Sequence, residues 1–381
     1  MLNGNREHGG ESPAAPGPTL CRPALWVPDH VITLDETLAL CRRLHGGHEK
    51  LRTVLRMIEN TGVSKRHIIQ PIEDTLRHPG VAVRTNIYER EIHRNLPGVV
   101  HDALRLADLS AQDIDAIVFV SCTGFTMPPI TTWMINDLGF RNDVRQIPIA
   151  QLGCAAGGAA INRAHDFCLA YPDANVLVVA CEFCSLCYQP SESDVGTLLS
   201  NGLFGDAIAA AVVRGSGGEG MMLRGNASHV VPDTKDWISY EIKETGYHFR
   251  LDRRVPGTMS MIAPALRRLA DGQGWRASAL DFYVIHAGGP RILDDLSRFL
   301  DVPADAFRHS RGVLADYGNI ASAVVLAALE RFFDDGDLVT GARGMLAGFG
   351  PGITAEVSLG TWAATETVSA DAHQDAQPSL V

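Results

Sequence analysis

Apolar residues follow two alternating patterns along the chain: helical spacing, and the short continuous runs typical of buried strands. Residues 160–170 show the helical spacing. The apolar runs lie at residues 114–120, 176–180, 280–286 and 345–349. Their alternation indicates an α/β protein. Both ends of the chain, residues 1–20 and 364–381, lack periodicity, so we expect them to be disordered.

The two halves of the chain repeat one another. The tetrapeptide RLAD precedes the first apolar run of each half, and small side chains, a helical pattern and another apolar run follow. Cys154 lies 39 residues after Asp115, and Asn319 lies 38 residues after Asp281. The spacing predicts two related βαβ halves, residues 21–225 and 226–363, whose central helices begin near each other at a pseudo-twofold axis.

Composition and charge exclude several classes of function. The chain has 381 residues and a formal net charge of −11 without a long basic tract, which argues against nucleic acid as a partner. No apolar run is long enough to span a bilayer, and the first twenty residues lack the apolar core of a signal peptide. With eight cysteines, we expect free thiols in a reducing cytoplasm and no membrane association.

Cys154 is the strongest candidate for a nucleophile. It precedes a run of alanine and glycine that opens the helical pattern. A helix N-terminus favours negative charge, so we expect a lowered thiol pKa, and small neighbours would let a substrate approach the sulfur. The alternative is a small buried residue at a tight corner.

His286 and Asn319 complete a possible set. His286 ends an apolar run before a glycine-rich turn, and Asn319 precedes an apolar helix, where asparagine is also a common N-cap. A thiol, an imidazole and a carboxamide together suit acyl-thioester chemistry. The thiolate would take the acyl group, and the other two would stabilise the developing oxyanion.

The motifs that surround these residues resemble those of the chalcone synthase-like type III polyketide synthases. They occur in the order GFTMP (124–128), QLGCAAGG (151–158), LFGD (203–206), VPG (255–257), HAGGP (286–290), YGNIAS (317–322) and GFGPG (348–352). The resemblance covers about residues 20 to 362. It implies a thiolase-like, five-layered αβαβα fold, a homodimer in which Met127 reaches into the partner's cavity, and no metal or bound cofactor.

Within that family, the segments 120–125 and 181–188 are most similar to bacterial 1,3,6,8-tetrahydroxynaphthalene synthases. The resemblance implies that Cys154, paired with His286, is acylated by malonyl-CoA and extended by decarboxylative condensation. Five malonyl units would cyclise to tetrahydroxynaphthalene, in pigment biosynthesis, without an acyl carrier protein. Phe204 and Phe249 match gate residues whose apolar rings would favour loss of the charged carboxylate as carbon dioxide.

Four further residues are predicted to line the cavity. Cys122, Cys184 and Cys187 occupy positions that are commonly threonine in plant relatives, and Tyr240 occupies a glycine position. These differences argue against a bulky starter and favour malonyl-CoA. Cys181, Cys184 and Cys187 also have the spacing of an iron–sulfur ligand run, but no fourth cysteine follows, so we expect a cavity wall.

Coenzyme A is anionic and needs local positive charge on an acidic protein. Arg56 matches a coenzyme A-contacting arginine of plant relatives, although Thr53 and Asn60 replace two neighbouring basic positions. Arg291, after the HAGGP turn, is a possible substitute. We interpret Lys50, Arg52 and Arg298 as solvated surface charges.

Three other interpretations remain open at the level of sequence. A malonyl- or acyl-CoA-primed relative could make a pyrone or resorcinol. A β-ketoacyl-ACP synthase III-type enzyme would share the Cys, His and Asn set, but would extend once with a carrier protein. A non-catalytic homologue could bind acyl-CoA as a partner subunit.

Overall fold

The computed structural model describes residues 17–77 and 80–364, and most strands of that part form one sheet. The ten strands are Thr19–Leu20 (β1), Ala24–Trp26 (β2), Ala116–Val120 (β5), Arg145–Ile149 (β6), Asn175–Phe183 (β7), Asp206–Arg214 (β8), Gly220–Val230 (β9), Phe282–Ile285 (β12), Arg343–Gly350 (β13) and Thr354–Ala363 (β14). Their order is β12-β13-β14-β9-β1-β8-β7-β5-β6, and β2 also pairs with β8. The two-residue β1 joins the halves because it pairs with both β8 and β9.

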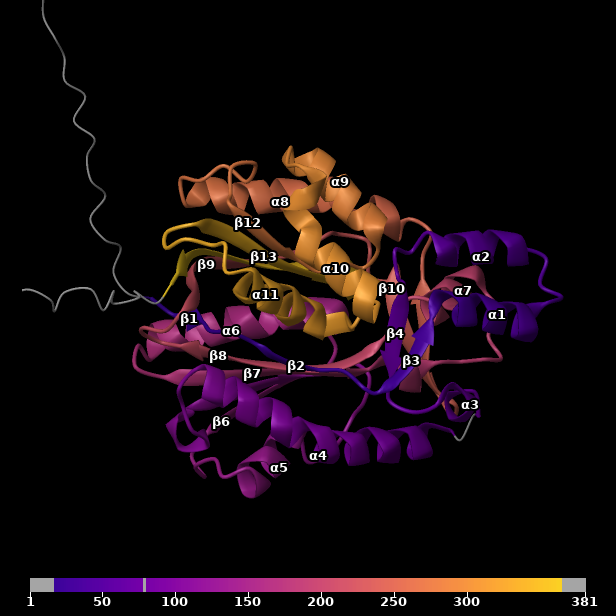
Figure 1. Ribbon diagram of the computed structural model, residues 1–381, viewed down its shortest axis with the longest axis horizontal. Coiled ribbons are helices and arrows are strands. Elements are labelled where there is room, and N and C mark those ends of the chain that lie inside the picture. The colour runs from indigo at the N-terminus through magenta and orange to yellow at the C-terminus, as the bar shows by residue number, and fades with distance from the viewer. Residues whose placement is uncertain (1–16, 78–79, 365–381) are drawn as a thin grey trace, which may run out of the picture.

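Helices cover both faces of each half of the sheet and so create five layers, as Figure 1 shows. The main helices are Gly80–Leu106 (α4), Ile130–Asp137 (α5), Ala156–Ala170 (α6), Met259–Gly272 (α8), Pro290–Leu300 (α9), Arg308–Tyr317 (α10) and Val324–Asp335 (α11). α6 and α11 lie between the halves, α4 and α5 cover the outside of the first, and α8 and α9 cover the outside of the second. The predicted αβαβα fold is confirmed.

Burial on both faces explains why the strands appear in the sequence as unbroken apolar runs. In β5, Val118 and Val120 pack into the middle layer with α6 and α11, whereas Ile117 and Phe119 face the outer layer. Alternate side chains of one strand therefore serve two separate cores.

The internal repeat predicted from the spacing is present in the structure. β5 pairs in parallel with β7, and β7 pairs antiparallel with β8. In the second half β12 pairs in parallel with β13, and β13 pairs antiparallel with β14. α6 and α11 occupy corresponding places between them, so their N-terminal ends meet at the centre of the molecule.

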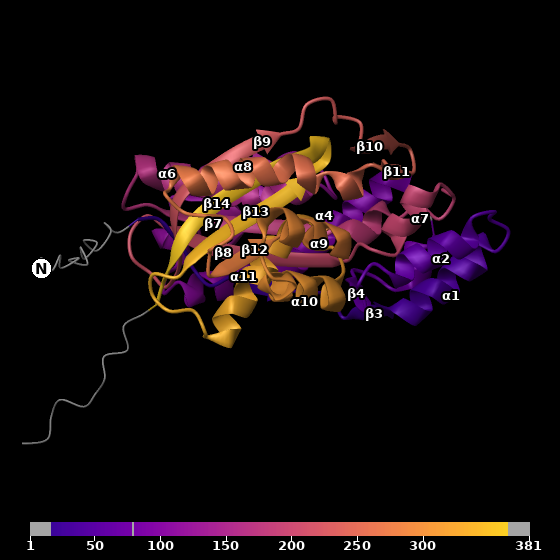
Figure 2. The same ribbon diagram turned by 90° about the horizontal axis from the view of Figure 1, so that it is seen from above.

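Smaller elements gather at one end of this core, on the right in Figures 1 and 2. They are His30–Thr33 (β3), Leu34–His45 (α1), Leu51–Glu59 (α2), Lys65–Ile68 (β4), Ile72–Thr75 (α3), Val195–Asn201 (α7), Ile238–Lys243 (β10) and Gly246–Leu251 (β11). β10 and β11 form a two-stranded hairpin outside the large sheet. The candidate site lies where this end meets the core.

Two predicted boundaries need correction. Residues 1–20 were expected to be disordered, yet Thr19 and Leu20 form β1 and are buried; two residues are too few for a strand to show a detectable alternation. The predicted division at 225/226 falls inside β9. Residues 1–16 and 365–381 lie outside the described residues.

Among the helices of the described part, none is both long and apolar enough to cross a membrane.

Candidate active site

Cys154 lies in a tight turn that leads directly into α6. The turn is the 3-10 segment Gly153–Ala155 (η2), and Gly153 has a φ of +52°. Only glycine adopts that conformation readily, and a Cβ there would lie 2.6 Å from Pro351. The thiol is therefore held at the N-terminal end of α6, as the sequence predicted.

The small residues after Cys154 allow the two halves to pack closely. A Cβ on Gly157 would lie 2.1 Å from the Ser322 carbonyl oxygen, and a Cβ on Gly158 would lie 2.7 Å from that of Glu356. Larger side chains would push α6 away from the second half. The glycines thus bring the turn of Cys154 against the 3-10 segment Ala321–Ala323 (η6), which opens α11.

Asn319 connects the other two predicted residues. Its Oδ1 accepts hydrogen bonds from the Ala321 backbone at 3.0 Å and from His286 Nε2 at 3.2 Å, and its side chain also hydrogen-bonds to Cys154. Its backbone is fixed in turn, because its N–H donates to the Leu203 carbonyl at 2.9 Å. The structure therefore brings together a thiol, a carboxamide and an imidazole from three distant segments.

The ionisation of Cys154 differs from the expectation. Burial raises the pKa of Cys154 to about 12, with a contribution from the Glu182 carboxylate, although a hydrogen bond from Asn319 acts in the opposite direction. Burial lowers the pKa of His286 to about 4. The predicted lowering of the thiol pKa is wrong, since burial of the thiol outweighs the effect of the helix end.

A cavity of about 510 Å³ opens beside these three residues. The predicted cavity, gate and coenzyme A residues that line it are Arg56, Cys122, Cys184, Phe204, Tyr240, Phe249 and Arg291. The rings of Phe204 and Phe249 meet edge to face at 5.4 Å, and Tyr240 meets Phe249 in the same way at 5.6 Å. Three aromatic side chains thus make a continuous apolar wall.

The three cysteines predicted to line the cavity occupy different places. Cys122 faces the main cavity, with its thiol 3.5 Å from Glu182. Cys184 borders both the main cavity and a smaller adjoining one, and Cys187 borders only the smaller one. Cys181 is buried in the outer core. Among the described residues, no group of three or more histidine, cysteine, aspartate or glutamate side chains is arranged to hold a metal ion.

The remaining predicted residues lie at the rim or outside. Arg56 and Arg291 line the cavity alongside Thr53 and Asn60. Met127 is 84% exposed on the surface and does not line the cavity of its own chain.

Sequence reasoning missed Glu182, which is fully buried beside the site. Its carboxylate accepts hydrogen bonds from the Cys122 backbone at 3.0 Å, from Thr123 Oγ1 at 3.0 Å and from Ser322 Oγ. Burial raises its pKa. The sequence contains one indication of this role. Glu182 closely follows the apolar run 176–180, and an unpaired carboxylate buried there would be costly.

A condensing enzyme of the thiolase-like fold is the class that this architecture and site define. The family models for the N-terminal and C-terminal domains of chalcone and stilbene synthases match residues 29–218 and 222–360. The chain therefore belongs to the chalcone and stilbene synthase family.

Individual relatives narrow the comparison. The chain is 65% identical to a 1,3,6,8-tetrahydroxynaphthalene synthase of Streptomyces coelicolor, over 90% of this chain and 92% of that one. It is 62% identical to the enzyme of the same name from Streptomyces griseus, over 94% and 96%. A crystal structure of the Streptomyces coelicolor synthase, described as a bacterial type III polyketide synthase, superposes with a TM-score of 0.89 and covers 90% of this chain and 99% of that one. The predicted family and type of enzyme are confirmed.

Proposed function

We propose that this enzyme is a type III polyketide synthase that builds 1,3,6,8-tetrahydroxynaphthalene from malonyl-CoA. The observation that carries the proposal is the contact of Asn319 with both Cys154 and His286 beside a largely apolar cavity. Relatives with 62 and 65% identity bear that product in their names and support the assignment.

The first step is acyl transfer to sulfur. The Cys154 Sγ attacks the thioester carbonyl of malonyl-CoA, while its proton passes to the imidazole of His286 and then to the departing sulfur of coenzyme A. A C–S bond forms and another breaks, so no oxidant or reductant is needed. His286 can accept the proton because burial lowers its pKa and so leaves the imidazole neutral.

Chain extension uses His286 and Asn319 in a second role. His286 Nε2 and the Asn319 carboxamide lie 3.2 Å apart, so one carbonyl oxygen of an extender malonyl-CoA can approach both. Donors at that place stabilise the enolate left by loss of carbon dioxide. The enolate carbon attacks the acyl carbonyl on Cys154, the C–S bond breaks, and the longer chain returns to the sulfur for another round.

The wall of the cavity limits what can bind. Tyr240, Phe204 and Phe249 narrow the space next to Cys184. A small starter, malonyl-CoA itself, suits this space better than an aromatic one. The ten carbons of a naphthalene correspond to five two-carbon units, each derived from one malonyl group.

Purified enzyme supplied with malonyl-CoA alone is expected to form 1,3,6,8-tetrahydroxynaphthalene and its oxidised derivatives, which liquid chromatography with mass spectrometry detects. A triketide or tetraketide lactone as the sole product would instead indicate a type III polyketide synthase with a shorter product. A requirement for an acyl carrier protein would indicate the β-ketoacyl-ACP synthase III type and would overturn the proposal.

Arg56 and Arg291 are proposed to bind the phosphates of coenzyme A at the rim. Arg291 is well exposed, and its Nε lies 3.8 Å from the Asp295 carboxylate. Replacing either arginine with alanine is expected to raise KM for malonyl-CoA about tenfold, the effect of losing one hydrogen bond to a charged group, with a smaller change in kcat. Lys50→Ala, at an exposed position beside Glu49, is the control and should leave KM unchanged. Equal KM values in all variants would show that the two arginines do not bind coenzyme A.

The remaining parts of the proposal concern assembly and location. We propose a homodimer in which the exposed Met127 contacts the second subunit, and an enzyme that needs no metal, organic cofactor or carrier protein. The eight cysteines are free thiols, which suits a reducing cytoplasm.

A further inference from the structure

The β10–β11 hairpin supplies part of the cavity wall although it is not paired with the large sheet. Tyr240 lies directly opposite Phe249 in the hairpin, and both side chains line the cavity. Because no strand pairing ties the hairpin to the core sheet, other contacts must set the distance between this wall and the wall that carries Cys184.

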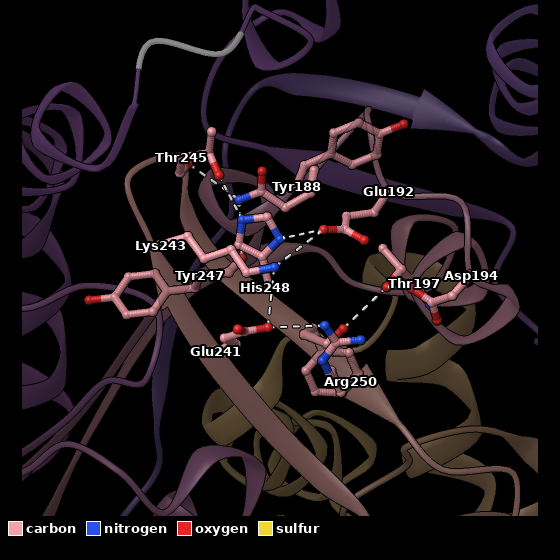
Figure 3. Close-up of polar contacts among 12 residues, drawn as sticks. Tyr188, Glu192, Asp194, Thr197, Glu241, Lys243, Thr245, Tyr247, His248 and Arg250 are labelled. Carbon is pink, nitrogen blue, oxygen red and sulfur yellow. Dashed lines mark hydrogen bonds and ion pairs between the residues drawn. The ribbon is translucent and has the colours of Figure 1, made fainter.

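Polar contacts on the opposite face of the hairpin supply that connection. Glu241 and His248 form the next opposed pair, so they point away from Tyr240 and Phe249. Figure 3 shows His248 between two partners, Thr245 and Glu192. Its Nε2 lies 2.7 Å from Thr245 Oγ1, and its Nδ1 lies 2.8 Å from Glu192 Oε1.

Glu192 belongs to the segment that leaves the opposite cavity wall. The 3-10 turn Cys184–Cys187 (η3) borders the cavities, and the chain then runs through Gln189 and Glu192 toward α7. The buried Gln189 side chain donates to the carbonyls of Thr245 and Tyr247 at 3.3 and 3.1 Å, in the turn and second strand of the hairpin. Thr197 of α7 donates to the Phe249 carbonyl at 3.2 Å.

The Glu192–His248 pair is less exposed than the other charged pairs of the hairpin, and Lys243 Nζ also lies 3.9 Å from the same Glu192 oxygen. The His248 side chain is only 7% exposed and that of Glu192 is 28% exposed, whereas Glu241 and Arg250, paired at 3.0 Å, are more than half exposed. Exposed ion pairs contribute little to holding a structure in place. The shielded pair is the stronger candidate for fixing the hairpin.

We infer that Glu192 and His248 are positioning residues: they hold Tyr240 and Phe249 at a set distance from η3 and so determine how far the polyketide is extended before release. This inference rests on the proposed function. Neither residue lines the cavity or touches Cys154, His286 or Asn319, so loosening the pair should change the size of the chamber and leave the reacting groups in place.

The test measures which products three variants make from malonyl-CoA. The products are compared at time points when each variant has released the same amount of coenzyme A. Glu192→Ala is expected to raise the ratio of shorter lactones to the longest product about fivefold, the equivalent of one lost hydrogen bond. Glu192→Gln keeps an oxygen that accepts from His248 Nδ1–H, so its ratio should stay near that of the parent. Glu241→Ala, on the same face of the hairpin but exposed, should not change the ratio.

Thermal melting shows whether each variant is folded. If Glu192→Ala does not fold, Thr245→Val, which removes the other ring contact of His248, should shift the ratio in the same direction by a smaller factor. An unchanged ratio in folded Glu192→Ala, or in Thr245→Val when it replaces that variant, overturns the inference. A parent enzyme that makes no aromatic product would refute the proposed function instead, and the variants would still be compared on the products that the parent makes.

Discussion

Cys154→Ala is expected to lower product formation from malonyl-CoA by a factor of at least about 10⁴, because the growing chain then has no sulfur to occupy between condensations. Loss of carbon dioxide from malonyl-CoA should continue in this variant, since His286 and Asn319 remain. Separate assays of aromatic product and of acetyl-CoA would show that condensation is lost while decarboxylation continues.

Cys168→Ala is the matched control for that experiment. Cys168 is a free, buried thiol on α6, the helix that follows the turn of Cys154; it packs in the middle-layer core and outside the cavity. It should retain product formation within a small factor. Unchanged product in Cys154→Ala would mean that this protein is not the catalyst, and would favour a non-catalytic partner subunit.

Asn319→Ala is expected to lower both decarboxylation and product formation by about 10²–10³, the usual effect of removing one donor from an oxyanion site. The same change deprives His286 Nε2 and the Ala321 N–H of their shared acceptor, so the imidazole also loses its orientation. The rate of acetyl-CoA formation from malonyl-CoA measures the loss of decarboxylation directly.

Asn226→Ala provides the comparison for Asn319→Ala. Asn226 hydrogen-bonds to His165 and Asp166, away from the cavity, so its loss should not affect decarboxylation. If Asn319→Ala decarboxylated malonyl-CoA at the parent rate, the enolate would have to be stabilised by other groups, and the second role assigned to Asn319 would be wrong.

The sequence contains much of the fold because its strands are buried on both faces. Runs such as 116–120 and 282–285 are visible as unbroken apolar segments, and the matched distances to Cys154 and Asn319 reveal the duplication. The same matched positions place both residues at helix starts that meet in the structure. The nucleophile, the imidazole and the carboxamide could therefore be predicted together.

Other features depend on contacts between distant segments and could not be read from local patterns. The role of Gly157 became clear only from the Ser322 carbonyl beside it, and the pKa of Cys154 depends on its enclosure and on Glu182. Likewise, His248 and Glu192 are 56 residues apart, and neither has a neighbouring motif. The hydropathy pattern predicts the layers of the fold, but it does not predict which side chains from distant segments contact each other.

Mass spectrometry of enzyme quenched during turnover of malonyl-CoA tests the central claim most directly. After proteolysis, the peptide that contains Cys154 should carry thioester-bound masses of one or more ketide units, removable by hydroxylamine and missing from Cys154→Ala. An unmodified Cys154 in enzyme that is making product, or ketide masses only on another cysteine such as Cys122, would contradict the account.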